Sequence, residues 1–382
     1  MKDTILFGDC RETLKNLTNS SVRTCVTSPP YYGLRDYGTA TWIGGDPNCN
    51  HRRDTKVNPE TCNTGHKNHD DMSGVGDAIY KTVCPKCGAI RQDDQLGLEE
   101  SPEEYIESLV SVFREVRNAL TDDGTLWVNL GDSYYNYRSD GNYPKQTVSK
   151  TRQDLPQSTP VRGNKLKGLK SKDLIGIPWM FAFAMRADGW YLRQDIIWHK
   201  PNPMPESVKD RCTKSHEYIF LFSKNKNYYY DIDAIREPHT WEETKPRPSG
   251  MARNAQKYRE KVKYGGGGTG LVGHSGTFKE DGSPLNHPLG KNKRSVWTVT
   301  TKPYKEAHFA VFPTELIEPC VKAGCPEEGT VLDPFGGSGT TGLVADRLGR
   351  NAKIIELNKD YIELANNRVM NDAPLFTDVS IR

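Results

Sequence analysis

Short apolar runs that end at small or polar residues recur along the chain and predict the strands of a sheet. In the N-terminal half these runs are residues 4–7, 22–27 and 125–130, and two later runs are residues 191–199 and 218–223. Short runs bounded by turn residues are typical of strands in a buried sheet. Ligands of open α/β sheets collect beyond the carboxyl ends of such strands, so the ends of these runs are candidate site positions.

The pattern changes to helical spacing after residue 100. Ser101 is a good N-cap, Pro102 suits the first helical position, and Glu104 completes a capping box. Apolar residues three and four apart then form one face, which comprises Ile106, Leu109, Val110, Phe113, Val116 and Leu120. We expect the turn-forming residues 122–124 to end this helix.

The C-terminal part alternates strand and helix. A strand over residues 330–333 runs into a proline- and glycine-rich turn, a helix over 341–348, a second strand over 352–356 and a helix over about 360–369. This alternation is typical of a doubly wound sheet. The predicted fold is therefore α/β, with a Rossmann-like doubly wound sheet interrupted by non-sheet regions at residues 44–97, 138–172 and 236–300.

Composition narrows the class of protein. Of 382 residues, 35% are hydrophobic and 26% charged, which supports a folded, polar protein. No apolar run is long enough to span a membrane, and the first residues lack the apolar core of a secretory signal, so we expect a cytoplasmic protein without membrane contact. The nine cysteines are an odd number, which argues against a disulfide framework.

Positive charge is concentrated in two segments, although the net charge is only +3. Residues 145–172 hold eight basic residues against one acidic residue, and residues 245–263 hold seven against one. Such segments are either solvated surface loops or contacts for phosphates. The second interpretation gains weight only if the neighbouring chemistry concerns nucleic acid.

A glycine-rich turn marks a candidate cofactor site. Gly337, Gly339 and Gly342 form a G-x-G-x-x-G pattern after a strand, and Glu356 ends the next strand, where a carboxylate can hold two ribose hydroxyls. No lysine follows the glycines, which disfavours a nucleoside triphosphate. NAD stays possible on the glycines alone, but only one further strand follows. The prefix Asp333-Pro334-Phe335 also suits a cofactor without a pyrophosphate.

A rigid turn, Ser28-Pro29-Pro30-Tyr31, marks the candidate catalytic centre at the end of residues 22–27. Two prolines fix the backbone, so the turn presents its carbonyls, the Ser28 hydroxyl and the Tyr31 ring in defined positions. An exocyclic amine of a base needs hydrogen-bond acceptors to free its lone pair for attack on a methyl sulfonium. The Ser28 Oγ and the Pro29 carbonyl are candidate acceptors, and Tyr31 could stack on a base flipped out of a duplex.

With both motifs in hand, the chain resembles the amino-methyltransferase family of bacterial and phage DNA methylases. The catalytic tetrapeptide precedes the cofactor glycines, which resembles the circularly permuted β-group. The resemblance implies S-adenosylmethionine as the cofactor. It adds to the cofactor-binding set, which becomes Asp9, Phe312, Pro313, Asp333, Phe335, Gly337, Ser338, Gly339, Thr340 and Glu356.

The resemblance also implies a division of the chain. Trp198 and Lys200 resemble the motif that lines the base pocket, and residues 232–300 correspond to a target-recognition region. Residues 1–43 and 98–231 would form the catalytic half, residues 44–97 an insertion, and residues 301–382 the cofactor half. The predicted partner is double-stranded DNA, bound by a monomer or homodimer, with a cognate restriction enzyme as a possible partner.

The resemblance predicts site-specific methylation of N4 of cytosine, because members with serine at the first tetrapeptide position mostly act there. Methylation of N6 of adenine is the alternative. Less favoured alternatives are an RNA or protein N-methyltransferase, which shares a similar turn, and a non-catalytic DNA-binding protein that has kept the fold.

The insertion carries a candidate metal site. Cys84 and Cys87 have the spacing of a zinc knuckle, and Cys49 and His51 complete a preferred set of four ligands. Four protein ligands leave no open position, so the expected metal is a structural zinc ion. Free cysteines are the alternative, and Cys62, His66 or His69 could replace Cys49 or His51.

Overall fold

The computed structural model describes residues 2–33, 39–51, 83–93, 95–135, 166, 168–239, 287–302, 311–372 and 378–381. The chain divides into two compact units, of which one comprises Met1–Tyr229 with Val296–Arg382 and the other comprises Tyr230–Ser295. Residues 145–165 and 245–263 of the basic segments lie outside the described residues, as do Cys62, His66 and His69. Among the described helices none is long and apolar enough to cross a membrane.

One large sheet organises the first unit. Its order is β11 (Asp378–Ile381), β1 (Lys2–Phe7), β10 (Asn351–Glu356), β9 (Thr330–Asp333), β2 (Val22–Thr27), β5 (Leu120–Leu130), β7 (His216–Ser223), β6 (Tyr191–His199) and β8 (Val296–Thr298). Neighbouring strands from β11 to β5 run parallel, whereas β7 is antiparallel to both of its neighbours. The predicted α/β class with a mostly parallel sheet is confirmed.

The sheet joins segments that are far apart in the sequence. The N-terminal strand β1 pairs with β10, so that Phe7 lies opposite Glu356. Strand β9 pairs with β2, which places the ends of the two predicted site strands side by side. In a sheet of parallel strands the carboxyl ends meet at one edge, and that edge is where ligands bind.

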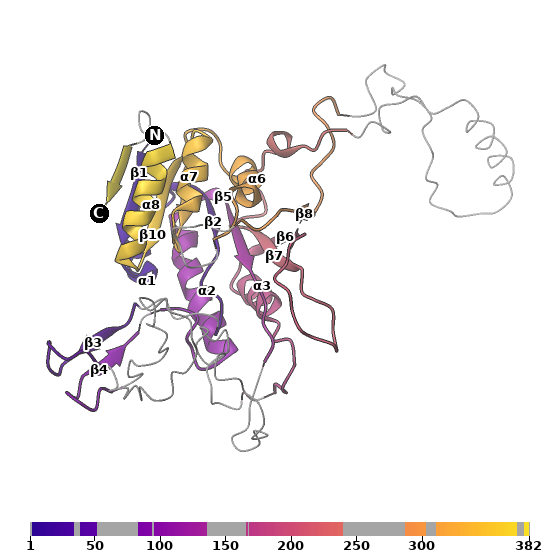
Figure 1. The fold of residues 1–382 in the computed structure, drawn as a ribbon. Coiled ribbons are helices and arrows are strands. Elements are labelled where there is room, and N and C mark those ends of the chain that lie inside the picture. The colour runs from indigo at the N-terminus through magenta and orange to yellow at the C-terminus, as the bar shows by residue number, and fades with distance from the viewer. Residues whose placement is uncertain are drawn as a thin grey trace, which may run out of the picture. The chain divides into compact units, whose positions relative to one another are not determined.

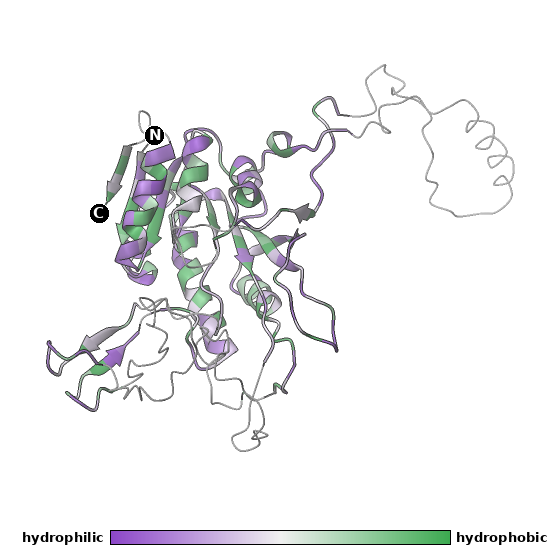
Figure 2. Ribbon diagram, in the orientation of Figure 1, coloured by the Kyte–Doolittle hydropathy of each residue, from purple (hydrophilic) through white to green (hydrophobic). Residues whose placement is uncertain are grey.

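Helices cover the sheet. These are α1 (Cys10–Thr13), α2 (Pro102–Ala119), α3 (Ile177–Ala187), α6 (Thr314–Gly324), α7 (Thr340–Arg347) and α8 (Lys359–Asp372). Helix α8 contacts β1 and β11, and α7 contacts β9 and β10, so both lie over the cofactor half of the sheet (Figure 1). The strands are largely apolar while α8 is mainly polar on its visible side (Figure 2), as expected for a buried sheet beneath surface helices.

The local prediction for α2 holds at its start and fails at its end. The Ser101 side chain accepts a hydrogen bond from the Glu104 backbone N–H, as predicted, whereas the Glu104 carboxylate accepts from the Glu100 N–H at 3.2 Å, one residue before the N-cap. Leu120, however, is not the last helical residue, because it begins β5 and lies opposite Val22. The register then shifts, so the predicted turn at residues 122–124 is an irregularity within the strand.

Two smaller features complete the description. In the first unit, β3 (Thr41–Ile43) and β4 (Ile90–Gln92) form a separate antiparallel pair, which we call the ribbon. In the second unit, Glu237 and Lys291 exchange two backbone hydrogen bonds of 2.8 Å. Strand β8 belongs to the large sheet, although its residues fall inside the predicted target-recognition range 232–300.

Candidate active site

The Ser-Pro-Pro-Tyr turn follows β2 and is held by hydrogen bonds from two sides. The Ser28 hydroxyl donates to the Asn129 carbonyl on β5, with 3.2 Å between the oxygens. The Tyr105 hydroxyl of α2 donates to the Pro30 carbonyl at 2.7 Å. Because the Ser28 proton points to Asn129, its oxygen lone pairs are left to accept from another donor.

Tyr31 is fixed at both ends of its side chain. A Cβ added to Gly131, which follows β5, would lie 2.5 Å from Tyr31 Cε2, so the ring packs directly against that glycine. The Tyr31 hydroxyl lies 2.8 Å from Glu217 Oε2 and 3.2 Å from Asn129 Oδ1. Burial and the nearby Glu217 charge raise the pKa of Tyr31 well above its ordinary value, so it remains a neutral donor.

Glu217 connects the turn to the predicted base-pocket residues. Its Oε1 accepts from the Lys200 ammonium, while its Oε2 accepts from the Asn129 amide at 3.2 Å. The Lys200 ammonium also lies 4.2 Å from the centre of the Trp198 ring. The Trp198 indole is buried and donates to the Val299 carbonyl at 2.8 Å. Trp198 and Lys200 are therefore linked to Tyr31 through Glu217.

The predicted cofactor loop, residues 334–339, lies between β9 and α7. Glu356, at the end of β10, accepts from the Gly337 N–H at 2.7 Å and from the Asn358 N–H at 2.8 Å. Burial raises the pKa of Glu356 above its ordinary value, while these two N–H groups oppose the shift. Gly339 has a φ of +76° and would place a Cβ 2.8 Å from the Ala365 Cβ of α8, so only glycine fits there.

Asp333 lies behind the loop. Its carboxylate is 1% exposed and accepts from the Thr27 and Thr341 hydroxyls, each at 2.6 Å. Burial raises the pKa of Asp333, and both hydroxyls lower it. Thr27 immediately precedes the catalytic turn and Thr341 belongs to α7. Asp333 thus ties the end of β2 to the first turn of α7.

The remaining predicted loop residues are held from α8. The Arg368 guanidinium donates to the Ser338 hydroxyl at 2.8 Å and to the Thr340 hydroxyl at 2.9 Å. At the other end of the cofactor half, Asp9 caps α1 by accepting from the Arg11 N–H at 2.8 Å and also pairs with the Arg11 guanidinium.

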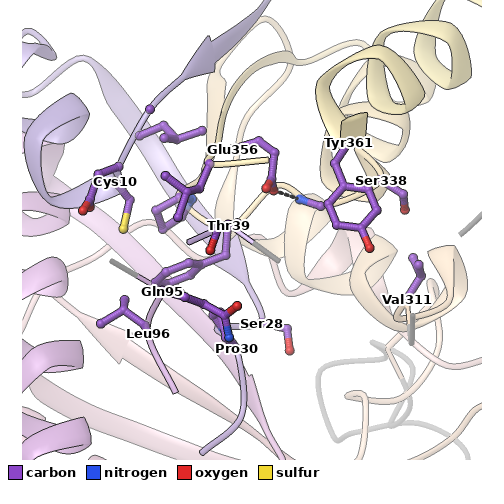
Figure 3. Close-up of a pocket in the computed structure, with 17 residues that line it drawn as sticks. Cys10, Ser28, Pro30, Thr39, Gln95, Leu96, Val311, Ser338, Glu356 and Tyr361 are labelled. Carbon is purple, nitrogen blue, oxygen red and sulfur yellow. Dashed lines mark hydrogen bonds between the residues drawn. The ribbon is translucent and has the colours of Figure 1, made fainter. Parts of the chain in front are cut away.

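One cavity brings the two predicted sites together. Of the predicted residues it is lined by Asp9, Ser28, Pro30, Phe335, Gly337, Ser338 and Glu356. In Figure 3, Ser338 and Tyr361 lie on one side of this cavity and Cys10 and Leu96 on the other. The predicted catalytic turn and the predicted cofactor loop, about three hundred residues apart in the chain, therefore open onto one space.

Other predicted residues are not among those that line this cavity. They are Pro29, Tyr31, Phe312, Pro313, Asp333, Gly339 and Thr340. Pro313 is buried at the start of α6, and the neighbouring Val311 lines the cavity instead of Phe312.

Sequence reasoning missed several lining residues. They are Gly8, Cys10, Thr39, Gln95, Leu96, Val311, Ile355, Leu357 and Tyr361. Most flank a predicted site residue and could have been found from that adjacency. Thr39, Gln95 and Leu96 are adjacent to no predicted site residue. They flank the strands of the ribbon, and their place at the cavity depends on the pairing of β3 with β4.

The cavity chemistry suits a cationic ligand with an apolar part. Two carboxylates, Asp9 and Glu356, line it together with Phe335 and Leu96, and among the described lining residues there is no lysine, arginine or histidine. A polyphosphate would find no positive side chain here, whereas a sulfonium or ammonium ligand with a ribose is well matched.

The four predicted metal ligands also come together, in the ribbon region. The ligand atoms of Cys49, His51, Cys84 and Cys87 all lie within 4.8 Å of one another. The Sγ atoms of Cys49 and Cys84 are 3.8 Å apart, and Cys87 Sγ is 3.5 Å from His51 Nδ1. These sulfurs are too far apart for a disulfide, which needs about 2.05 Å.

The sheet and its edge cavity define an S-adenosylmethionine-dependent methyltransferase fold. Comparisons with known proteins give the family: the model of a family described as DNA methylase, which covers N6 and N4 amino-methyltransferases, matches residues 22–367. The chain belongs to this DNA methylase family.

Relatives of known type extend over nearly the whole chain. It is 38% identical to the Type II methyltransferase M.Cfr9I of Citrobacter freundii, over 97% of this chain and 88% of that protein. It is also 38% identical to the Type II methyltransferase M.SmaI of Serratia marcescens, over 96% of this chain and 90% of that protein. The solved PvuII DNA methyltransferase (cytosine-N4-specific) shares the fold, with a TM-score of 0.52, 16% identity, and coverage of 96% of this chain and 87% of that one.

Proposed function

We propose that this protein transfers a methyl group from S-adenosylmethionine to N4 of cytosine at a specific site in duplex DNA. The observation that carries the proposal is the shared cavity, in which Ser28 of the catalytic turn and Glu356 of the cofactor half face the same space. A methyl donor held by the residues around Glu356 would lie beside an amine held by the turn that contains Ser28.

The cofactor would be held by residues that the sequence singled out. Glu356 ends β10 with a carboxylate whose backbone partners leave further lone pairs for ribose hydroxyls. Asp9 and Phe335 line the same cavity and would contact the cofactor through charge and ring packing. When bound, S-adenosylmethionine supplies an electrophilic methyl group.

The residues of the catalytic turn would activate the amine. The lone pair of an exocyclic amine is delocalised into the base, so the amine attacks poorly until its protons are held by acceptors. Ser28 Oγ is suited to this role because its own proton is donated to Asn129. The Pro29 carbonyl would be the second acceptor, and the Tyr31 ring would stack on the flipped base.

The methyl transfer can then proceed in line. The nitrogen lone pair would take the methyl group that S-adenosylmethionine supplies, while Ser28 Oγ and the Pro29 carbonyl hold the protons of the amine. The methylated nitrogen, positively charged after the transfer, would then lose one proton to solvent water, because neither a serine hydroxyl nor a peptide carbonyl is basic enough to keep it. No covalent bond between the protein and the base is needed.

The proposal of cytosine as the methylated base rests on Ser28, since family members with serine at this position mostly methylate cytosine. N6 of adenine is the alternative. Residues 232–300 are proposed as the target-recognition region, which overlaps the second unit. Because the relatives M.Cfr9I and M.SmaI are Type II methyltransferases, a cognate restriction enzyme is a proposed partner.

A transfer assay with labelled cofactor tests the proposal. Incubation of the protein with S-[methyl-³H]adenosylmethionine should label duplex DNA, and should leave matched RNA and protein substrates unlabelled. Labelling of RNA or protein in preference to DNA would contradict it. Salt-sensitive DNA binding without cofactor binding would instead support a non-catalytic DNA-binding role.

A further inference from the structure

We propose that Cys49, His51, Cys84 and Cys87 bind one zinc ion, and that this ion supports S-adenosylmethionine binding by holding the ribbon against the cofactor cavity. The cofactor part of the inference rests on the proposed function. The metal part rests only on the cluster of ligand atoms.

The cluster has the geometry of a structural zinc site. Two sulfurs bound tetrahedrally to one zinc ion at about 2.3 Å each lie about 3.8 Å apart. The Cys49 and Cys84 sulfurs have this 3.8 Å separation. Three thiolates and one imidazole form a closed set of soft ligands that favours zinc and leaves no open coordination position for catalysis.

The backbone around the cluster is arranged as a knuckle. The Gly88 N–H donates to the Cys84 carbonyl at 2.7 Å, and the Cys84 N–H donates to the Ala89 carbonyl at 2.8 Å. On the opposite side, the His51 ring stacks on Trp42 with 4.2 Å between centroids and a 15° interplanar angle. These contacts orient both pairs of ligands toward one point.

Without a metal the ribbon has little to hold it together. Each of its strands has three residues, and a two-stranded pair of this size is not stable alone in water. Ile43 and Ile90, which face each other across the pair, are 56% and 58% exposed. In the described part of the ribbon and knuckle, residues 41–51 and 83–92, the buried side chains are Cys84 and Ala89. A bound ion would replace the missing apolar core.

The base of the ribbon forms part of the cofactor cavity. Thr39 precedes β3 by two residues, and Gln95 and Leu96 follow β4 shortly after its end. All three line the cavity. The positions of these side chains therefore depend on the pairing of β3 with β4.

A set of contacts links the predicted metal ligands to the cavity wall that Thr39, Gln95 and Leu96 form. Trp42 stacks on His51 and lies opposite Arg91 in the strand pairing. Arg91 forms a 3.1 Å ion pair with Asp93, and both side chains are largely buried. The Asp93 carboxylate accepts from the Thr39 hydroxyl at 3.2 Å and from the Gln95 N–H at 3.3 Å. Loss of the metal would loosen the wall through these contacts.

The experiment measures zinc content and cofactor affinity on the same full-length samples. Zinc per chain is determined by mass spectrometry of the metal, and the Kd for S-adenosylmethionine by titration calorimetry. The variants are Cys84→Ser and Cys87→Ser. Cys212→Ser is the matched control, because Cys212 is an exposed cysteine outside the cluster.

We expect one zinc per chain in the wild type and in Cys212→Ser, with equal affinities for the cofactor. Cys84→Ser and Cys87→Ser should lack zinc and bind the cofactor at least about tenfold more weakly, which corresponds to about 1.4 kcal/mol. Because a variant can simply misfold, wild-type protein is also stripped with a chelator. Its Kd should weaken by a similar factor and recover when zinc is added back.

Three results would overturn parts of the inference separately. Reduced wild-type protein that holds no zinc after zinc is supplied contradicts the metal site. A zinc-free sample with wild-type cofactor affinity contradicts the coupling. Wild-type protein that holds zinc but binds no S-adenosylmethionine contradicts the proposed function, and the coupling with it, while the metal site stands.

Discussion

The hydroxyl oxygen of Tyr31 lies 2.8 Å from Oε2 of Glu217, a residue on a strand almost two hundred positions further along the chain. The same carboxylate accepts a hydrogen bond from the Lys200 ammonium. An aromatic ring held by a partly buried, charged partner has a fixed orientation. This orientation is what a stacking surface for a flipped base requires.

Replacing Tyr31 by phenylalanine tests this relationship. The ring remains, but the hydrogen bond to Glu217 is lost. Since such a bond to a charged group is worth on the order of 1.5–3 kcal/mol, we expect kcat/KM for DNA to fall at least about tenfold. The Kd for S-adenosylmethionine should not change, because neither residue lines the cofactor cavity.

Tyr32→Phe is the matched control for that measurement. Its hydroxyl donates to the Glu100 carbonyl at 3.3 Å and does not contact Glu217. Equal losses of kcat/KM in the two variants would show that the Tyr31–Glu217 contact has no special role.

Ser28→Ala tests the amine-activating acceptor. We expect kcat to fall on the order of a hundredfold or more, the usual effect of deleting one preorganised group at a developing charge. Cofactor affinity should stay within a few-fold of wild type, measured by calorimetry. Ser111→Ala is the control, because the Ser111 hydroxyl donates to the Ser108 carbonyl on an exposed part of α2. Full activity of Ser28→Ala would remove Ser28 from the mechanism.

Gly131→Ala tests the packing beneath the Tyr31 ring. The added Cβ would lie 2.5 Å from Tyr31 Cε2, so the ring must move. Gly131 does not have a positive φ, and alanine therefore brings no backbone strain of its own. We expect DNA methylation to fall strongly while the thermal unfolding midpoint changes little. An unchanged rate would mean that Tyr31 does not need its observed position.

The raised pKa of the buried Asp3 carboxyl predicts that the stability of the protein depends on pH. Burial, with a smaller contribution from the Asp346 charge, raises the pKa of Asp3 to about 7, against the lowering effect of the Ala352 N–H. Because the pKa of Asp3 is higher in the folded state than in the unfolded state, the folded state binds its proton more tightly. The free energy of unfolding is therefore largest below about pH 4, where both states are protonated, and this gain is lost as the pH rises through about 7. Wild-type stability should therefore decline across this window.

Asp3→Asn should remove most of that decline. The amide oxygen can still accept from the Ala352 N–H, and no charge needs to be buried. With about 1.4 kcal/mol per unit of pKa shift, we expect the variant to be more stable than wild type by a few kcal/mol at about pH 8, and by less toward pH 4. Thermal unfolding at both pH values measures this. A constant difference between the two proteins would argue against titration of Asp3.

Much of the fold follows from local patterns. The strand predictions at residues 22–27, 191–199 and 330–333 coincide with β2, β6 and β9. Each is a short apolar-rich run bounded by turn residues, so its limits are set locally. The strand order was not predictable in the same way, because the pairing of β1 with β10 joins residues at opposite ends of the chain.

The site was predictable where a motif marks it. Ser28, Gly337 and Glu356 were identified from the sequence and line one cavity. Glu217 carries no motif, and its role depends on the antiparallel pairing of β7 with β5. Thr39 and Gln95 depend in the same way on the register of the ribbon. Residues whose role arises from pairing between distant segments cannot be found from local sequence.

Nucleoside analysis of methylated DNA distinguishes methylation of the exocyclic amine of cytosine from methylation of that of adenine. Plasmid DNA is incubated with the protein and S-adenosylmethionine, digested to nucleosides and analysed by mass spectrometry. The account predicts N4-methylcytosine with wild-type protein and its loss with Ser28→Ala. Recovery of N6-methyladenine would contradict the choice of base, and the absence of any new methylated nucleoside would contradict the proposed reaction.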